Sequence, residues 1–240
     1  MPAAREAIAH ARAADAKAEL IEALVREATF VGLIGEIEEA DRLHAQARSE
    51  AKAAHAHELV ARSYNGQLAA YAGSDGLSAG VEALLTEALA YVREHCGERL
   101  RRYLELNAAV FHVEHGDALA AEAILSAMSV ADDDSETGGF EVVNFHHLQA
   151  QVGLARGRLD RVAAALDTAE PLAAAYQDST YIGYQHRLRA ELARRSGHLD
   201  DAALAVDAAV EILAAGDDRA YLRDAVLEAV RGCAAQAEVA

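Results

Sequence analysis

The chain has 240 residues, of which 52% are hydrophobic, and a formal net charge of -17 at pH 7. A surface this acidic repels the phosphates of nucleic acids and of anionic lipids, so we expect neither direct nucleic-acid binding nor membrane association. Cys96 and Cys233 are too few for a disulfide framework or a zinc site. No apolar stretch approaches the ~18 residues of a membrane span, and the N-terminus lacks the apolar core of a signal peptide. We therefore expect a cytoplasmic protein without a cofactor.

The composition favours helices along the whole chain. Alanine, the strongest helix former, supplies much of the apolar content, and the only prolines are Pro2 and Pro171. No run alternates β-branched and aromatic residues in the way that strands do. The expected fold class is all-α.

Glycines mark a repeat of about 41 residues. Successive members of the set are 41, 40, 41 and 40 residues apart, at Gly35, Gly76, Gly116, Gly157 and Gly197. Alanine stands seven residues before each glycine, at Ala28, Ala69, Ala109, Ala150 and Ala190. A large apolar residue stands five before each, at Phe30, Tyr71, Phe111, Val152 and Leu192. Alanine or valine stands five after each, at Ala40, Val81, Ala121, Val162 and Ala202. Twelve after stand Ala47, Ala88, Met128, Ala169 and Ala209. The pattern predicts that each glycine ends one helix in a left-handed conformation, and that small residues let this helix cross the next closely.

The glycine register predicts helices in chain order. A leading half-repeat helix is expected at 3–14. First helices are expected near 16–34, 57–73, 98–114, 140–155 and 180–195. Second helices are expected near 37–54, 79–95, 118–129, 160–176 and 200–214. A trailing half-repeat helix is expected at 218–236, so the half-repeats either cap the array or continue into a longer protein. The acidic, glycine-containing segment 129–140 interrupts the rhythm and is expected to be a solvated connector, because it lacks the alternating ligands of a calcium-binding loop.

These motifs resemble those of the tetratricopeptide-repeat superfamily. A small residue, a large apolar residue, a helix-ending turn and a second small residue follow one another in the family's order. The early tryptophan of the family is missing, and the period exceeds the usual 34 residues by about seven, or two helical turns. Long repeats of this kind are similar to the sensor regions of large bacterial transcriptional activators of the maltose-regulator and LuxR-like types. The resemblance implies a right-handed α-solenoid of five hairpins, forming a single domain over residues 1–240.

The resemblance also implies a binding surface. In such solenoids the first helices line the concave face, with side chains 13, 10, 6 and 3 residues before each glycine turned inward. The expected binding residues are Tyr103, Leu106, Asn144, His147, Gln151, Tyr184, Arg187, Glu191 and Arg194. The late arginines, with Arg195 beside them, either bind an acidic or carboxylate group of a partner or pair with Glu191 and nearby acids.

Histidines are numerous, and their role is a separate question. The chain has 11, but no GxSxG, HExxH, CxxC or phosphate-cradling motif accompanies them. We expect partly buried, hydrogen-bonded histidines rather than a metal site. If the chain were an enzyme, Tyr103, His147, Tyr184 and His186 would be the candidate groups.

Three functions are compatible with the sequence. The favoured hypothesis is a non-enzymatic scaffold that holds a protein or peptide along the concave surface. The second is the sensory module of a bacterial transcriptional regulator, with a peptide or small-molecule effector. The third is an enzyme built on this scaffold.

Overall fold

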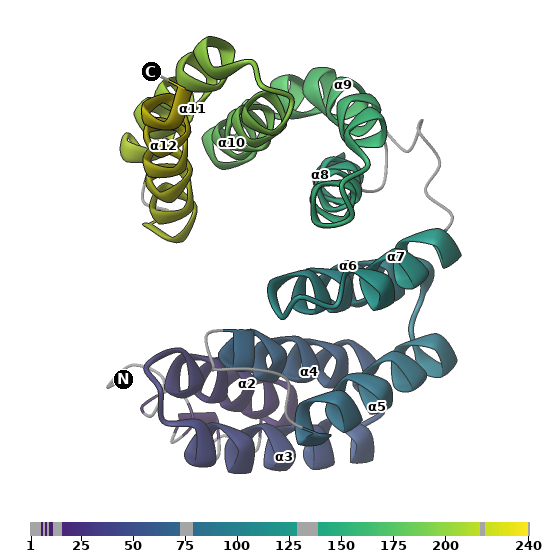
Figure 1. Cartoon of the computed structure of the whole chain (residues 1–240). Coiled ribbons are helices and arrows are strands. Elements are labelled where there is room, and N and C mark those ends of the chain that lie inside the picture. The colour runs from purple at the N-terminus through teal and green to yellow at the C-terminus, as the bar shows by residue number, and fades with distance from the viewer. Residues whose placement is uncertain are drawn as a thin grey trace. The chain divides into compact units, whose positions relative to one another are not determined.

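The computed structural model describes residues 16–72, 79–128, 139–216 and 219–239, together with Glu6, Ile8, His10 and Ala11. This part of the chain consists of helices and connecting turns and contains no strand, which confirms the expected all-α class (Figure 1). Gly76, the segment 129–138 and most of the leading helix 3–14 lie outside the described residues. No helix in the described part is long and apolar enough to cross a lipid bilayer.

The described part of the chain contains helices α2 to α12 in sequence order. Their bounds are α2 Lys17–Leu33, α3 Ile37–Ala53, α4 His57–Ala72, α5 Ala79–His95, α6 Glu98–Glu114, α7 Ala118–Ala127, α8 Gly139–Ala155, α9 Leu159–Tyr176, α10 Ser179–Arg195, α11 Leu199–Ala214 and α12 Arg219–Val239. The expected bounds are confirmed to within three residues, and to within one residue at most helix ends. At 10 residues, α7 is much shorter than α9, which has 18. The predicted connector 129–140 is two residues too long, because α8 begins at Gly139.

The turn glycines have the predicted conformation wherever the structure describes them. Gly35, Gly116, Gly157 and Gly197 have φ between +69° and +91°. At Gly157 the amide donates to the carbonyl of Leu154, and the next amide, of Arg158, donates to the carbonyl of Gly153. This pair of bonds satisfies carbonyls that the end of α8 would otherwise leave without donors. The repeat therefore has a physical cause, since each of the four described turn glycines has the left-handed conformation that ends its helix.

Small residues form the helix crossings, with one exception. Ala28, Ala109, Ala150 and Ala190 are buried, as are all five small or branched residues five positions after the glycines. Ala69 is exposed, which contradicts the predicted pattern. Helix α4 begins 19 residues before Gly76, whereas the other first helices begin 18 before their glycines. A shift of one residue turns a side chain by about 100° around the helix, so Ala69 leaves the buried face.

In α4 the close approach is made by Gly66 instead. A Cβ added at Gly66 would lie 2.1 Å from Thr29 Oγ1 and 3.0 Å from His44 Cε1. Thr29 belongs to α2 and His44 to α3, so Gly66 fits into the contact of three helices. The large apolar position also varies, because Phe111 and Val152 are buried whereas Phe30 is 45% exposed.

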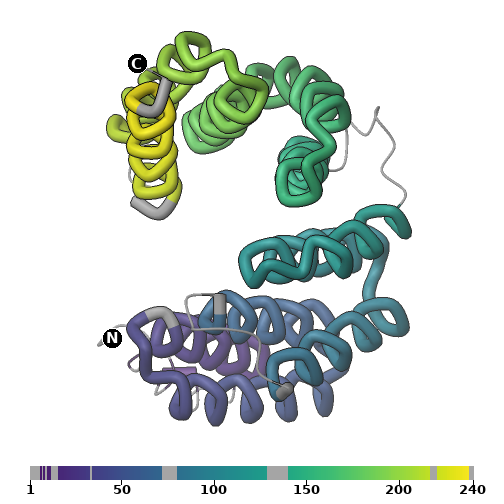
Figure 2. Tube along the Cα trace, viewed as in Figure 1, coloured from purple at the N-terminus to yellow at the C-terminus, as the bar shows by residue number. Residues whose placement is uncertain are grey.

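The chain forms two compact units, Met1–His115 and Gly116–Ala240. In the first unit α2 packs against α3 and α4, α3 against α4, and α4 against α5 and α6. In the second, α8 packs against α9 and α10, and α10 against α11 and α12. The same order of contacts thus occurs twice: a first helix packs on its own second helix and on the next first helix. Figure 2 follows the chain from helix to helix through each unit.

Candidate functional site

The predicted binding residues of the second unit come from α8 and α10. Tyr184, Arg187 and Glu191 are buried, whereas Arg194 is partly exposed. On α8, Asn144 and Gln151 are partly exposed and His147 is buried. The remaining predicted residues belong to α6 of the first unit, where Tyr103 is partly exposed and Leu106 is buried. Leu106 and His147 are thus out of reach of a partner in this conformation.

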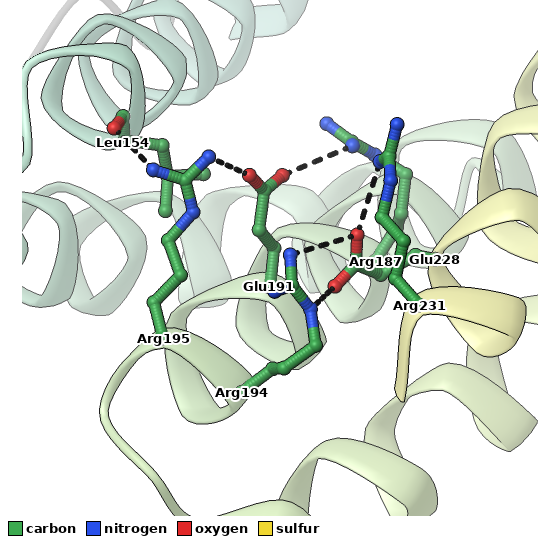
Figure 3. Close-up of polar contacts among 7 residues, drawn as sticks. All are labelled: Leu154, Arg187, Glu191, Arg194, Arg195, Glu228 and Arg231. Atoms are coloured by element: carbon green, nitrogen blue, oxygen red, sulfur yellow. Dashed lines mark hydrogen bonds and ion pairs between the residues drawn. The ribbon is translucent and has the colours of Figure 1, made fainter. Parts of the chain in front are cut away.

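Arginines of α10 form a polar network with two carboxylates (Figure 3). Glu191 accepts a bond of 2.5 Å from Arg195 Nη2 and a longer one of 3.5 Å from Arg187 Nη1. Arg195 Nη1 also donates to the carbonyl oxygen of Leu154, at 2.6 Å. This carbonyl lies in the last turn of α8, where helix carbonyls lack intrahelical donors and attract cations. Arg195 therefore connects α8 with α10.

The second carboxylate, Glu228 of α12, is almost completely buried. Its side chain is 1% exposed and accepts bonds from Arg194 Nε at 2.5 Å and Arg231 Nη1 at 3.2 Å. The hydrogen bond from Arg194 raises the pKa of that guanidinium further above its usual range. Burial of a carboxylate this deeply is costly unless cations donate hydrogen bonds to it. Glu228 and Arg194 thus connect α10 with α12.

The network contains more positive than negative charge. Arg187, Arg194, Arg195 and Arg231 surround the two carboxylates, which leaves a formal charge of +2 on the six side chains. The side chains of Arg195 and Arg231 are 37% and 56% exposed, so solvent reaches both. Arg187 Nε is buried and has no hydrogen-bond acceptor among the described residues. The exposed guanidinium groups of Arg195 and Arg231 can still donate to an incoming carboxylate.

A tyrosine supports Arg187 from one side. The Arg187 guanidinium carbon lies 4.7 Å from the centroid of the Tyr184 ring, a cation–π contact. The Tyr184 ring also makes edge contacts with Tyr221 of α12 and His147 of α8. Burial raises the pKa of Tyr184 above its usual range, so the phenol stays neutral at physiological pH. Tyr184 thus holds the arginine in place and does not add charge.

His147 is a structural residue of the core. Its Nε2 lies 2.7 Å from Gln185 Oε1, and the Gln185 amide donates to the carbonyl of Leu166 in α9. Burial lowers the pKa of His147 to about 4, so the imidazole is neutral at pH 7. A donor and acceptor chain of this kind joins α8, α10 and α9. It does not present His147 to a substrate.

Sequence reasoning missed Glu228, Arg231 and the Leu154 carbonyl. The repeat contained a signal for Glu228, because one period of 41 residues after Arg187 arrives at position 228. The arginines pair with Glu191 and Glu228, as one of the two alternatives for these side chains predicts. The excess of two arginines over acids is already present on α10, and α12 leaves it unchanged because it adds one carboxylate and one guanidinium.

A second polar network lies in the first unit, between α3, α4 and α5. Asp41 accepts hydrogen bonds from Tyr71 at 2.6 Å and from Gln67 at 2.7 Å. Arg48 donates to Gln67 and lies 4.7 Å from the centroid of the Tyr64 ring. The remaining members follow in one chain of contacts: Tyr64 donates to Glu87 at 2.6 Å, and Lys52 pairs with Glu87 at 3.4 Å. Two cations face two carboxylates, so this network is balanced.

Comparisons with protein-family models, with curated proteins and with solved structures found no match to the chain. The candidate site is therefore chosen from the structure alone. It is the network on α8, α10 and α12, in which arginines outnumber carboxylates.

Proposed function

We propose that the chain is a tetratricopeptide-like helical scaffold that binds an acidic segment of a protein partner through the arginine network of its second unit. The first helices α8, α10 and α12 would form adjacent ridges of a right-handed solenoid, with the network on their shared face. The twofold occurrence of the same packing order supports this arrangement. The function proposed is binding without catalysis.

The observation that carries the proposal is the local excess of positive charge. A chain with a net charge of -17 gathers four arginines around two carboxylates and leaves two of the guanidinium groups accessible. An arginine fork donates two parallel hydrogen bonds to one carboxylate, so an acidic side chain or a free C-terminus is the fitting ligand group. Binding of a partner carboxylate would bring the network closer to neutrality.

The proposal is tested with Arg195→Gln combined with Arg231→Gln. These two side chains are accessible, whereas Arg194 and Arg187 support the fold through Glu228 and Glu191. The probe is a fluorescein-labelled peptide of aspartate and glutamate residues with a free C-terminus, followed by fluorescence anisotropy at constant ionic strength. We expect saturable binding that the double variant weakens at least about tenfold, since each charge-assisted bond contributes on the order of 1.5–3 kcal/mol.

Arg189→Gln provides the matched control. Arg189 is also on α10, but it pairs with Asp167 at 2.6 Å and Glu170 at 2.8 Å, both from α9. This variant should leave peptide affinity unchanged. Equal affinity of the wild-type chain and the Arg195/Arg231 double variant would overturn the proposed site, as would equal binding of a lysine-rich peptide.

A further inference from the structure

A cleft of about 340 Å³ lies between α7, α8 and α9 of the second unit. Its apolar part is formed by Leu125, Val152 and Ala165, and polar side chains such as Ser126 and Gln149 lie beside them. Gly153 in its wall lets α8 and α9 approach closely, because a Cβ there would lie 2.7 Å from Val162 Cγ2. The volume is at the small end of the range for small-molecule sites.

Arginines are concentrated at one end of this cleft. The left-handed turn at Gly157 has Arg156 before it and Arg158 after it, and Arg161 follows in the first turn of α9. Arg158 and Arg161 line the cleft. All three converge on one carboxylate, Glu122 of α7. Arg156 Nε lies 3.2 Å from Glu122 Oε2, Arg161 Nη1 lies 3.8 Å from Oε1, and Arg158 donates to Oε1.

This concentration is specific to one repeat. The positions before, just after and four after the glycine hold Ile34, Glu36 and Glu39 in the first repeat. They hold His115, Asp117 and Ala120 in the third, and Ser196, His198 and Asp201 in the fifth. None of these is an arginine or lysine. The helix turn requires only the glycine, so the fold alone does not account for the arginines in the fourth repeat.

The charge at this end of the cleft is incompletely neutralised. Three guanidinium groups facing one carboxylate leave a formal charge of +2, and Arg161 is 68% exposed and too far from Glu122 for a hydrogen bond. Each guanidinium has five N–H donors, whereas a carboxylate accepts about four hydrogen bonds. Donors at Arg158 and Arg161 thus remain available at the cleft.

We propose that this cleft binds a small organic anion, with its phosphate or carboxylate group on Arg158 and Arg161 and a short apolar body over Leu125, Val152 and Ala165. The site is distinct from the peptide surface, because it is formed by second helices α7 and α9 with one side of α8. It does not rest on the proposed function, and it assigns a small-molecule ligand to a chain whose other network suits a polypeptide.

Three probe ligands separate the contributions of charge and of apolar surface to binding in the cleft: phenyl phosphate, benzoate and inorganic phosphate. Isothermal titration calorimetry at constant ionic strength should give saturable binding of phenyl phosphate that is at least about fivefold tighter than binding of inorganic phosphate, because the apolar body is also buried. A comparison with benzoate shows whether phosphate or carboxylate is preferred. Binding of benzyl alcohol, which is neutral, with the affinity of phenyl phosphate would overturn the proposal.

Two variants act in opposite directions. Arg161→Gln removes an exposed donor and should weaken phenyl phosphate binding about fivefold or more. Glu122→Gln removes the carboxylate that competes for the arginines and should tighten binding. If Glu122→Gln lowers the melting temperature too far for titration, Arg161→Gln still decides the matter, because no buried contact depends on it. Unchanged affinity in Arg161→Gln, or binding that does not saturate, would contradict the proposed site.

The Arg195/Arg231 double variant and Arg189→Gln serve as controls for position. Both change arginines of the same unit that do not line the cleft. Phenyl phosphate affinity should be retained in both. If the double variant lost as much phenyl phosphate affinity as Arg161→Gln does, the anion would be responding to the overall charge of the unit. That outcome would contradict binding in the cleft. The calorimetry with phenyl phosphate does not depend on peptide binding, so either proposal can be contradicted while the other holds.

Discussion

The polar networks of the two units differ in their balance of charge. In the first unit Arg48 and Lys52 share α3 with Asp41, and Glu87 completes an equal set of cations and carboxylates. Tyrosine and glutamine side chains connect these charged groups through hydrogen bonds. In the second unit the arginines outnumber the carboxylates. The balanced network neutralises its own charges within the fold, whereas we propose that the unbalanced one attracts an external anion.

The two networks also differ in how far their carboxylates are exposed to solvent. The carboxylate of Glu87 is 58% exposed, and that of Glu228 is 1% exposed. An exposed pair contributes little to stability, because water screens its attraction. A buried carboxylate depends on its partners, and they depend on it. The second unit therefore combines a rigid buried pair, Arg194 and Glu228, with accessible arginines at its margins.

The largest expected effect is the loss of the buried charge at Glu228. Glu228→Gln leaves Arg194 partly buried without its carboxylate, and the unfolding free energy should fall by about 3 kcal/mol. Glu87→Gln, the counterpart in the first unit, should cost less than about 1 kcal/mol. Urea denaturation followed by circular dichroism measures both. Equal losses for the two variants would remove the distinction between the units.

Acid should destabilise both units in the same way. Burial lowers the pKa of His44 and of His147 to about 4, from an ordinary value of 6.5. The unfolded chain binds these protons more readily, so stability is full above pH 6.5, falls as the pH drops towards 4 and levels off below that. Each histidine contributes on the order of 3 kcal/mol.

The variants His44→Gln and His147→Gln isolate this contribution. Each should flatten the dependence of the urea midpoint on pH between 6.5 and 4, relative to the wild-type chain. His10→Gln is a suitable control, because the His10 side chain is 80% exposed. A pH dependence that neither core variant changes would contradict the neutral, buried state assigned to these imidazoles.

A smaller effect is expected from the tyrosine that completes the balanced network. Tyr64→Phe keeps the buried ring but removes the hydrogen bond of 2.6 Å to Glu87. The loss should be about 1 kcal/mol, the contribution of one hydrogen bond, because Lys52 still pairs with Glu87. A loss above about 3 kcal/mol in thermal or urea unfolding would mean that the first network is as dependent on single partners as the second.

The smallest expected effect on stability is that of the accessible arginines. Arg195→Gln with Arg231→Gln should change the unfolding free energy by less than about 1 kcal/mol, because both side chains are exposed and water can replace the bonds that Arg195 makes to Glu191 and Leu154. In this double variant Glu191 still pairs with Arg187, and Glu228 still pairs with Arg194. Differential scanning calorimetry of the double variant checks this. A large fall in the melting temperature would place both arginines in the structural network.

The sequence predicted the helices well, because their cause is local and repeated. A left-handed glycine and small crossing residues recur once per period, and they determined almost every helix bound. The register of α4 was wrong at Ala69, since the fit of Gly66 between Thr29 and His44 depends on three helices together. The position of a residue relative to the turn glycine does not reveal a contact among three helices.

The candidate site was predicted less completely. Arg187, Glu191 and Arg194 were assigned to the right helix, but their partner Glu228 comes from the trailing half-repeat. Whether an inward-facing side chain is reachable depends on how closely neighbouring first helices pack. Leu106 and His147 are buried, as are Val25, Gly66 and Arg187 at the same position of the other repeats.

The most direct test of the central claim is a nuclear magnetic resonance titration of arginine side chains with the acidic peptide. The Nε–Hε signals of Arg195 and Arg231 should shift along saturating curves with one common dissociation constant, while the signal of Arg48 in the balanced network stays in place. Equal shifts at Arg48 and Arg195, or no shift at Arg195 and Arg231 at saturating peptide, would contradict the account.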